Sequence, residues 1–251
     1  MVLTYQGGVT KTDTLVETTQ PSTAWAGDFP VTYDIVLADG NILIEVDGKW
    51  LYIDTGATTT IGHTATFEFG GRIFPCVSNF NGFTTEGLAD LVGHKVDYLV
   101  GLEVLKHFPF KIDMGQKIIT FYPEGYEFPD GYVVPTRMET NGLPLIRFPF
   151  KLNGKLIEGY FDTGCPNSFM DGRVEGIPDG TADDSWLPYG KWTMQLYRNQ
   201  VEFGNRRFEM KFGNFPRDCP LFNVGAWMCG GQFLKSGPVG FDIARNRLHL
   251  F

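Results

Sequence analysis

Hydrophobic and polar residues alternate over short segments along most of the chain, and turn residues separate one segment from the next. The first clear example is GNILIEVDGKWLYIDTG, which ends at Gly56 and in which Asp47-Gly48 separates two alternating runs. Such runs predict half-buried β-strands, and the Asp-Gly pair predicts a tight hairpin turn between them. The pattern therefore predicts an all-β fold built from hairpins.

Helical patterns are confined to two short segments. TEGLADLVG begins at Thr85, with Thr84 or Thr85 as the N-cap, and LEVLKHF begins at Leu102. The 251 residues include 31 Gly and 15 Pro, which suits a fold rich in turns, and the 43% hydrophobic residues can fill a sizeable core. We expect most of the aromatic residues to lie in that core.

The same series of segments occurs twice. The block that ends at Gly56 recurs as LPLIRFPFKLNGKLIEGYFDTG, which ends at Gly164. Two later blocks recur in the same order, FEFGGRIFPCVSNF as VEFGNRRFEMKFGNF and YLVGLEVLKHFPFKIDMGQKIITFY as WMCGGQFLKSGPVGFDIARNRLHLF. Three shared blocks in one order predict a duplication, with one lobe at residues 31–137 and a second at residues 138–251.

Each copy of the first block ends in Asp-Thr-Gly, which places Asp54 in one lobe and Asp162 in the other. Two carboxyl groups held close together cannot both ionise cheaply, so they share one proton. The ionised member can then activate a water molecule while the protonated member donates to a substrate carbonyl oxygen. The pattern therefore indicates peptide hydrolysis with no metal ion, no cofactor and no covalent intermediate.

With these motifs the chain resembles the aspartic peptidases of the pepsin and retropepsin superfamily. Hydrophobic residues precede Asp-Thr-Gly at residues 52–56 and 160–164, and the later hydrophobic-hydrophobic-Gly signature occurs at 99–101 and 228–230. The resemblance covers residues 31–251, and the short lobes are more similar to bacterial or archaeal retropepsin-like proteins than to long eukaryotic pepsins. It implies a bilobal pepsin/retropepsin-like fold with a cleft between the lobes and aspartic endopeptidase activity on a peptide or protein substrate.

The resemblance also implies a role for each position of the two motifs. Asp54 and Asp162 form the catalytic dyad. The threonine hydroxyls bind the backbone of the opposite loop, and the glycines leave room and amide groups beside the carboxylates. These supporting residues are Thr55, Gly56, Thr163 and Gly164.

Two other functions stay open for this pattern. A duplicated β protein can keep both Asp-Thr-Gly turns while serving as a catalytically silent peptide-binding or scaffolding module. A carbohydrate hydrolase also uses two carboxylates, although these need not lie in matched Asp-Thr-Gly loops. Both acids, both threonines and both glycines are intact in this chain, which favours the endopeptidase.

Charge and composition narrow the partners further. The formal net charge of -8 disfavours a nucleic-acid or anionic-membrane surface. No apolar run reaches transmembrane length and the N-terminus lacks a signal-peptide core, so we expect a cytoplasmic protein. We also expect it to be a monomer. The four cysteines and four histidines show no metal-ligand spacing, and we expect free thiols and ordinary surface or loop histidines.

A hairpin that closes the cleft, the flap of this superfamily, is expected in the second lobe alone. It lies in the family between the Asp-Thr-Gly loop and the next repeated block. Only 11 positions lead from Gly56 to Phe67, too few for a projecting hairpin, whereas 37 lead from Gly164 to Val201.

The longer interval contains DDSWLPYGKWTMQLYRNQ, in which LPYG reads as a turn between two strands. Its Tyr-Gly pair, Tyr189 and Gly190, resembles the tip of the pepsin flap. We therefore predict one flap around residues 186–192, with Tyr189 near the dyad. An ordinary surface hairpin far from the acids is the alternative.

Two further expectations concern pH and the N-terminus. Ala57 and Cys165 follow the two motifs, where acid-active pepsins resemble one another in carrying a Ser or Thr hydroxyl. A hydroxyl bonded to the carboxylate lowers its pKa, so we expect a pH optimum less acidic than pepsin's. The role of residues 1–30 stays open between a flexible arm, an edge strand and a removable prosegment.

Overall fold

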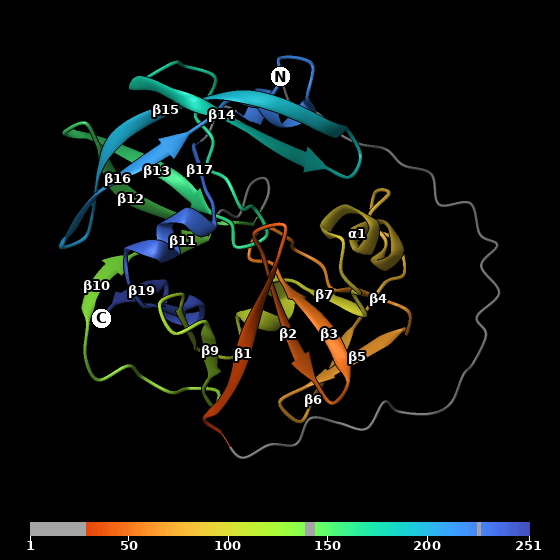
Figure 1. The fold of residues 1–251 in the computed structure, drawn as a ribbon. Coiled ribbons are helices and arrows are strands. Elements are labelled where there is room, and N and C mark those ends of the chain that lie inside the picture. Colours follow the sequence, from red (N-terminus) through yellow and green to blue (C-terminus); the bar gives the residue numbers. More distant parts are fainter. Residues whose placement is uncertain (1–28, 139–143, 225–226) are drawn as a thin grey trace.

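The computed structural model of the chain describes residues 29–138, 144–224 and 227–251 (Figure 1). Strands make up most of its regular structure and the helices are short, so the prediction of an all-β fold is confirmed. Nearly all of the N-terminal segment 1–30 lies outside the described residues. Below, residues 31–137 are called the first half and residues 138–251 the second half.

The larger sheet has ten strands among the described residues, in the order β10-β19-β18-β8-β9-β1-β2-β3-β7-β4. The strands of the first half are β1 (Val31–Ala38), β2 (Asn41–Val46), β3 (Lys49–Ile53), β4 (Ile61–Gly62), β7 (Tyr98–Val100), β8 (Phe110–Asp113), β9 (Ile118–Phe121) and β10 (Tyr132–Pro135). The other two are β18 (Val239–Asp242) and β19 (Arg247–Leu250), from the end of the chain. The halves therefore share this sheet, because β18 pairs with β8.

The second sheet belongs to the second half, apart from the first residue of β11, and follows the order β14-β15-β12-β13-β17. In addition, β11 pairs with β12, and β16 pairs with β15. Its strands are β11 (Arg137–Met138), β12 (Ile146–Leu152), β13 (Lys155–Phe161), β14 (Ile177–Trp186), β15 (Gly190–Phe203), β16 (Arg206–Phe212) and β17 (Trp227–Cys229). A separate hairpin in the first half consists of β5 (Thr66–Phe69) and β6 (Arg72–Pro75).

Helices are short and connect strands. They are α1 (Thr85–Val92), α2 (Leu102–Leu105) and the 3₁₀ turns η1 (Pro220–Val224), η2 (Gly231–Ser236) and η3 (Ile243–Arg245). Thr84 is the N-cap of α1, since its side chain accepts a hydrogen bond from Gly87 N at 3.1 Å. Gly93 ends α1 with a φ of 66°, a left-handed conformation that suits glycine.

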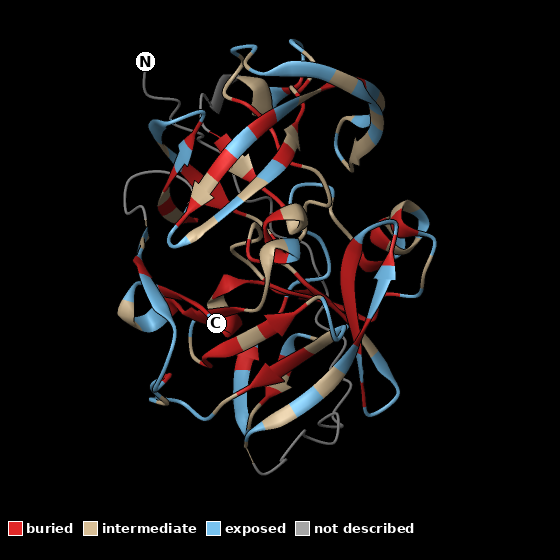
Figure 2. Ribbon diagram, turned by 60° about the vertical axis from the view of Figure 1, so that its left-hand side comes forward, coloured by how far each residue is buried: buried red, intermediate tan, exposed pale blue. Residues whose placement is uncertain are grey.

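One hydrophobic core runs through both halves and combines aliphatic side chains with many aromatic rings. Phe110 and Phe241 stack at 4.6 Å where the halves meet, and Phe161 packs against Phe241 at 5.0 Å. Figure 2 shows buried residues along the strands of both sheets, whereas the long hairpin β14–β15 is largely intermediate or exposed. The core fixes the position of the two Asp-Thr-Gly loops, because β3 and β13, which lead into them, end in buried residues.

Candidate active site

The two Asp-Thr-Gly loops leave their sheets in the same way. In the first half, β3 runs parallel to β7, and the backbone N–H of Asp54 donates to Val100 O at 3.1 Å. In the second half, β13 runs parallel to β17, and Asp162 N donates to Cys229 O at 3.0 Å. Each hairpin therefore delivers its acid at the end of a buried strand that a second, parallel strand supports.

The glycine of each hydrophobic-hydrophobic-Gly signature holds the Asp-Thr-Gly loop from behind. Gly101 N donates to Thr60 Oγ1 at 3.2 Å, and Gly230 N donates to Ser168 Oγ at 3.0 Å. A Cβ on Gly230 would overlap the carbonyl oxygen of Asn167, so a larger residue would push the loop away. The close approach of two backbones explains why glycine occurs at these positions.

The two threonines join the loops across the boundary between the halves. Thr55 N donates to Thr163 Oγ1 and Thr163 N donates to Thr55 Oγ1, both at 3.0 Å. Each hydroxyl in turn donates to the opposite backbone, Thr55 to Phe161 O at 3.1 Å and Thr163 to Ile53 O at 2.8 Å. Both side chains are fully buried, so losing either hydroxyl would leave polar groups without partners, at about 1–3 kcal/mol for each group.

The glycines bring the two carboxyl groups together. A Cβ on Gly56 would overlap the Asp162 carboxyl group, and a Cβ on Gly164 would overlap that of Asp54. Each glycine also donates its N–H to the acid of its own loop, Gly56 to Asp54 Oδ1 at 2.7 Å and Gly164 to Asp162 Oδ1 at 2.9 Å. The six motif residues predicted from the sequence therefore meet at one place, with each acid beside the opposite glycine.

The two acids differ in how strongly their protons are held. Burial raises the pKa of Asp54 above its ordinary value, although hydrogen bonds from Gly56 N, Asp162 and Ala57 N offset part of the increase. Burial also raises the pKa of Asp162, and the charge of Asp54 raises it further, so it lies well above its ordinary value. Asp54 accepts two backbone N–H groups and Asp162 accepts one, so the pair favours the charge on Asp54 and the shared proton on Asp162.

A cavity of about 350 Å³, below called the dyad cavity, is lined by both halves, with Gly164 of the second Asp-Thr-Gly loop in its wall but neither acid among its lining residues. Tyr52 lies in its wall, and the hydroxyl is 2.7 Å from Asn41 Oδ1 and 2.8 Å from Gly164 O, two acceptors on different halves. Asp184 of β14 also lines the cavity and accepts a hydrogen bond from Asn167 Nδ2 at 2.7 Å.

The sequence assigned no role to Tyr52, Asn41 or Asp184. A tyrosine precedes each acid by two positions, and this repeated signal was available in the sequence for Tyr52. For Asn41 and Asp184 the chain offers no local signal, because they reach the cavity only through the packing of the two halves.

The predicted turn between two strands at residues 187–190 is confirmed. Strands β14 and β15 pair antiparallel up to Trp186 and Gly190, and Tyr189 N donates to Trp186 O at 2.8 Å. Gly190 has a φ of 108°, a conformation that favours glycine. Figure 1 shows this hairpin extending from the second sheet toward α1.

The tip of the hairpin contacts the first half. A Cβ added to Gly87 of α1 would lie 2.9 Å from the Leu187 side chain, so the two residues are already in contact. The rings of Trp186 and Phe83 lie 6.1 Å apart. The hairpin therefore crosses from one half to the other beside the dyad cavity.

Tyr189, expected near the dyad, makes its contacts elsewhere. Its hydroxyl donates to Asp218 Oδ1 at 2.7 Å, and its ring packs edge-on against Trp192 at 5.7 Å. Both partners belong to the second half. The part of the hairpin that lines the dyad cavity is instead residues 183–185 of β14.

One prediction about the histidines is wrong. His249 is not a surface or loop residue, because it lies on β19 with only 4% of its surface exposed and packs against Phe128 at 4.9 Å. Strand β19 lies between β10 and β18, which buries His249, and burial lowers its pKa, so it is a neutral core residue. The four cysteines, Cys76, Cys165, Cys219 and Cys229, are free.

Neither a metal site nor a membrane helix was found in the part of the chain that the structure describes. There, no group of three or more His, Cys, Asp or Glu side chains is arranged to hold a metal ion. No helix of the described residues is both long and apolar enough to cross a membrane.

No protein-family model matches the chain, and no curated protein matches it either. The function must therefore be inferred from the site itself.

Proposed function

We propose that this chain is an aspartic endopeptidase with a bilobal pepsin/retropepsin-like fold, in which each half supplies one acid of the dyad. The observation that carries the proposal is the pair of buried carboxyl groups, Asp54 and Asp162, from two equivalent loops joined by their threonines. A single chain provides both acids, so the proposed active form is a monomer. Its free thiols suit the reducing cytoplasm.

The backbone hydrogen bonds to the two acids support one distribution of roles, because Asp54 accepts two N–H groups and Asp162 accepts one. Asp54, ionised, takes a proton from a water molecule held between the carboxyl groups, and the water oxygen attacks the peptide carbonyl carbon. Asp162, protonated, donates to the carbonyl oxygen as the tetrahedral diol forms. The diol then collapses: Asp54 returns its proton to the leaving nitrogen, the C–N bond breaks, and Asp162 takes back a hydroxyl proton.

The first prediction concerns the acids themselves. Asp54→Asn or Asp162→Asn alone should reduce hydrolysis of a mixed peptide library by about a thousandfold or more, since either change removes the shared proton. The measurement is cleavage from acid to neutral pH, with and without a statine-type inhibitor that mimics the diol. Asp34→Asn, at an exposed position of β1, is the matched control and should leave cleavage unchanged.

Two outcomes would contradict the proposal. Cleavage that survives in both asparagine variants would place the chemistry elsewhere. Folded wild-type protein that binds peptides but cleaves none at any pH would instead identify a peptide-binding module on the same fold.

A further inference from the structure

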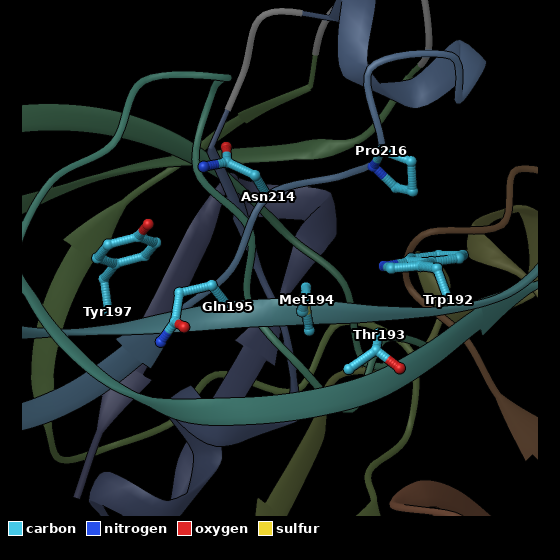
Figure 3. Close-up of a pocket in the computed structure, with 7 residues that line it drawn as sticks. All are labelled: Trp192, Thr193, Met194, Gln195, Tyr197, Asn214 and Pro216. Carbon is cyan, nitrogen blue, oxygen red and sulfur yellow. The ribbon is translucent and has the colours of Figure 1, made fainter.

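A second pocket lies along β15, on the long hairpin. It has a volume of about 220 Å³, and Figure 3 shows its residues in two groups, one on β15 and the other, Asn214 and Pro216, in the segment that follows β16. The β15 group begins at Trp192, near the hairpin tip, and ends at Tyr197. The pocket is therefore an elongated site between the hairpin and the body of the second half.

Two buried polar atoms of this pocket have no hydrogen-bond partner among the described residues. They are Nε1 of Trp192, which is a donor, and Oδ1 of Asn214, which is an acceptor. Each unpaired group costs about 1–3 kcal/mol. A ligand that offers an acceptor to Trp192 and a donor to Asn214 removes that cost, and this favours its binding.

The pocket adjoins the dyad cavity. Trp192 lies directly opposite Asp184 in the antiparallel ladder, so both side chains are on the same face of the hairpin, and Asp184 lines the cavity. Phe169, 6.3 Å from the Trp192 ring, belongs to a buried cluster that packs against Cys165, three positions after Asp162. The two cavities are therefore neighbours across the Asp184–Trp192 pair of the hairpin.

The lining also defines the chemistry of the occupant. None of the seven lining residues is Asp, Glu, Lys, Arg or His, so a charged ligand would gain no ion pair there. Met194 and Pro216 supply apolar contact, and the donor and acceptor come from separate elements. An extended peptide fits this arrangement, because it presents carbonyl oxygens and amide N–H groups along its length.

We infer that this pocket binds a neutral, extended stretch of the peptide substrate next to the residues held at the dyad. In this arrangement the indole N–H of Trp192 donates to a peptide carbonyl, and Oδ1 of Asn214 accepts from a peptide N–H. The inference rests on the proposed function, because it identifies the occupant as substrate. It makes Trp192 and Asn214 substrate-binding residues outside the Asp-Thr-Gly motifs.

The hairpin allows the peptide to enter. Neither polar atom is exposed, so the walls of the pocket must part before a peptide reaches them. Strand β15 pairs with β12 and β16 only from Tyr197 onward, and residues 190–196 pair with β14 alone. Strand pairing with the rest of the sheet is thus confined to the base, and the outer part can move once its packing against Phe169 and Phe215 loosens.

A peptide titration followed by the indole N–H signals tests the pocket without catalysis. The ¹⁵N-labelled full-length Asp54→Asn variant is titrated with tetra-alanine, acetylated and amidated at its ends, to millimolar concentration. The signal of Trp192, assigned by its loss in Trp192→Phe, should move downfield and saturate. Trp227 has an equally buried and unpaired Nε1 that does not line the pocket, so its signal should stay in place. A Trp192 signal that does not move overturns the inference.

Kinetics provide the second test. Trp192→Phe and Asn214→Leu should each lower kcat/KM for long peptides about tenfold, mainly by raising KM. A change of this size is expected when one hydrogen bond to the substrate is lost. Trp227→Phe, the matched control, should stay within about twofold. Equal losses in Trp192→Phe and Trp227→Phe would show a structural effect and overturn the inference. If the wild-type protein cleaves nothing, the proposed function fails, and the titration still decides whether the pocket binds peptide.

Discussion

The two Asp-Thr-Gly loops are alike in backbone and support but differ around the acids. The threonine hydrogen bonds and the overlapping glycine positions occur in both directions across the boundary. Asp54, however, accepts N–H groups from both Gly56 and Ala57, whereas Asp162 accepts one, from Gly164. The second donor stabilises the charge on Asp54. A duplicated support can therefore hold two acids with different tasks.

The segments after the loops differ far more. In the first half, the hairpin β5–β6 is short, and it packs against the core with Phe67 and Phe69 buried. In the second half, the strands of β14–β15 have 10 and 14 residues, and their tip reaches α1 on the other half. Among the described residues, only the second half therefore carries a projecting hairpin, and the two halves differ most at this element.

Among the changes that test this comparison of the two halves, the largest effect is expected where the halves are most alike. Gly164→Ala places a Cβ where the Asp54 carboxyl group lies, so the loop must shift, and kcat should fall at least about hundredfold. Gly56→Ala should lose as much, by the same overlap with Asp162. The measurement is steady-state hydrolysis, with Gly115→Ala at an exposed turn as the control. A loss confined to one of the two variants would contradict the equivalence of the loops.

The next effect concerns stability and separates the two acids. Folding raises the pKa of Asp162, so the folded protein binds this proton more tightly than the unfolded chain, and stability falls as pH rises above 3.8 toward the raised pKa. Asp162→Asn cannot lose a proton, so it should raise Tm at neutral pH by about 4 °C or more. Asp54→Asn should gain less, because two N–H groups favour its ionised form.

Thermal unfolding at neutral pH and at a pH below 3.8 measures this difference. The advantage of Asp162→Asn should disappear at the lower pH, where wild-type Asp162 is protonated in both the folded and the unfolded chain. An advantage that is the same at both pH values would show that titration of Asp162 is not its cause.

A smaller effect is expected at the residue after each motif. Burial contributes most to the raised pKa of the Cys165 thiol, followed by the charge of Asp184. The charges of Asp162 and Asp54 raise this pKa further, so the thiol lies close to both acids. In Cys165→Thr a hydroxyl can donate to the carboxylate, which should move the acidic limb of the pH–rate profile to lower pH by a fraction of a unit. Cys165→Ala, with no hydroxyl, is the control. An acidic limb that stays in place or moves to higher pH would exclude this explanation of the pH optimum.

The smallest effect is expected at the hairpin tip. Leu187→Ala removes the contact with Gly87 on the other half, and KM should rise about twofold to fivefold, since roughly 0.5–1 kcal/mol of apolar contact is lost. Tyr189→Phe removes only the hydrogen bond to Asp218 and should change KM less. Peptide hydrolysis and inhibitor binding measure both. A larger effect at Tyr189 would indicate that its side chain turns toward the dyad when substrate binds.

Local patterns allowed the sequence to predict much of this arrangement. The paired motifs identified Asp54 and Asp162 because each acid follows a hairpin whose two strands and turn are contiguous in the sequence. The turn before Gly190 and the start of α1 were also local, since a glycine with positive φ and the Thr84 cap each act within a few positions. These features need no knowledge of the other half of the chain.

Contacts between distant segments could not be predicted in this way. The Tyr52 hydroxyl donates to Gly164 O, 112 positions away along the chain. The Tyr189 hydroxyl donates to Asp218, a partner that the local sequence around Tyr189 does not identify. His249 is buried because β19 pairs with β18 and β10 on its two sides. Each depends on which strands are neighbours, and alternation within a single strand does not determine that.

The pairing of β8 with β18 has a consequence for the origin of the chain. In the repeated blocks Phe110 corresponds to Val239 and Ile112 to Phe241. Phe110 lies opposite Phe241 and Ile112 opposite Val239, so β8 and β18 pair through equivalent edges. Such a self-complementary junction is isologous, the kind of interface that joins two identical subunits about a twofold axis. An ancestor of half this length could have used it to form a homodimer, and gene fusion would then have freed one copy to acquire the long hairpin.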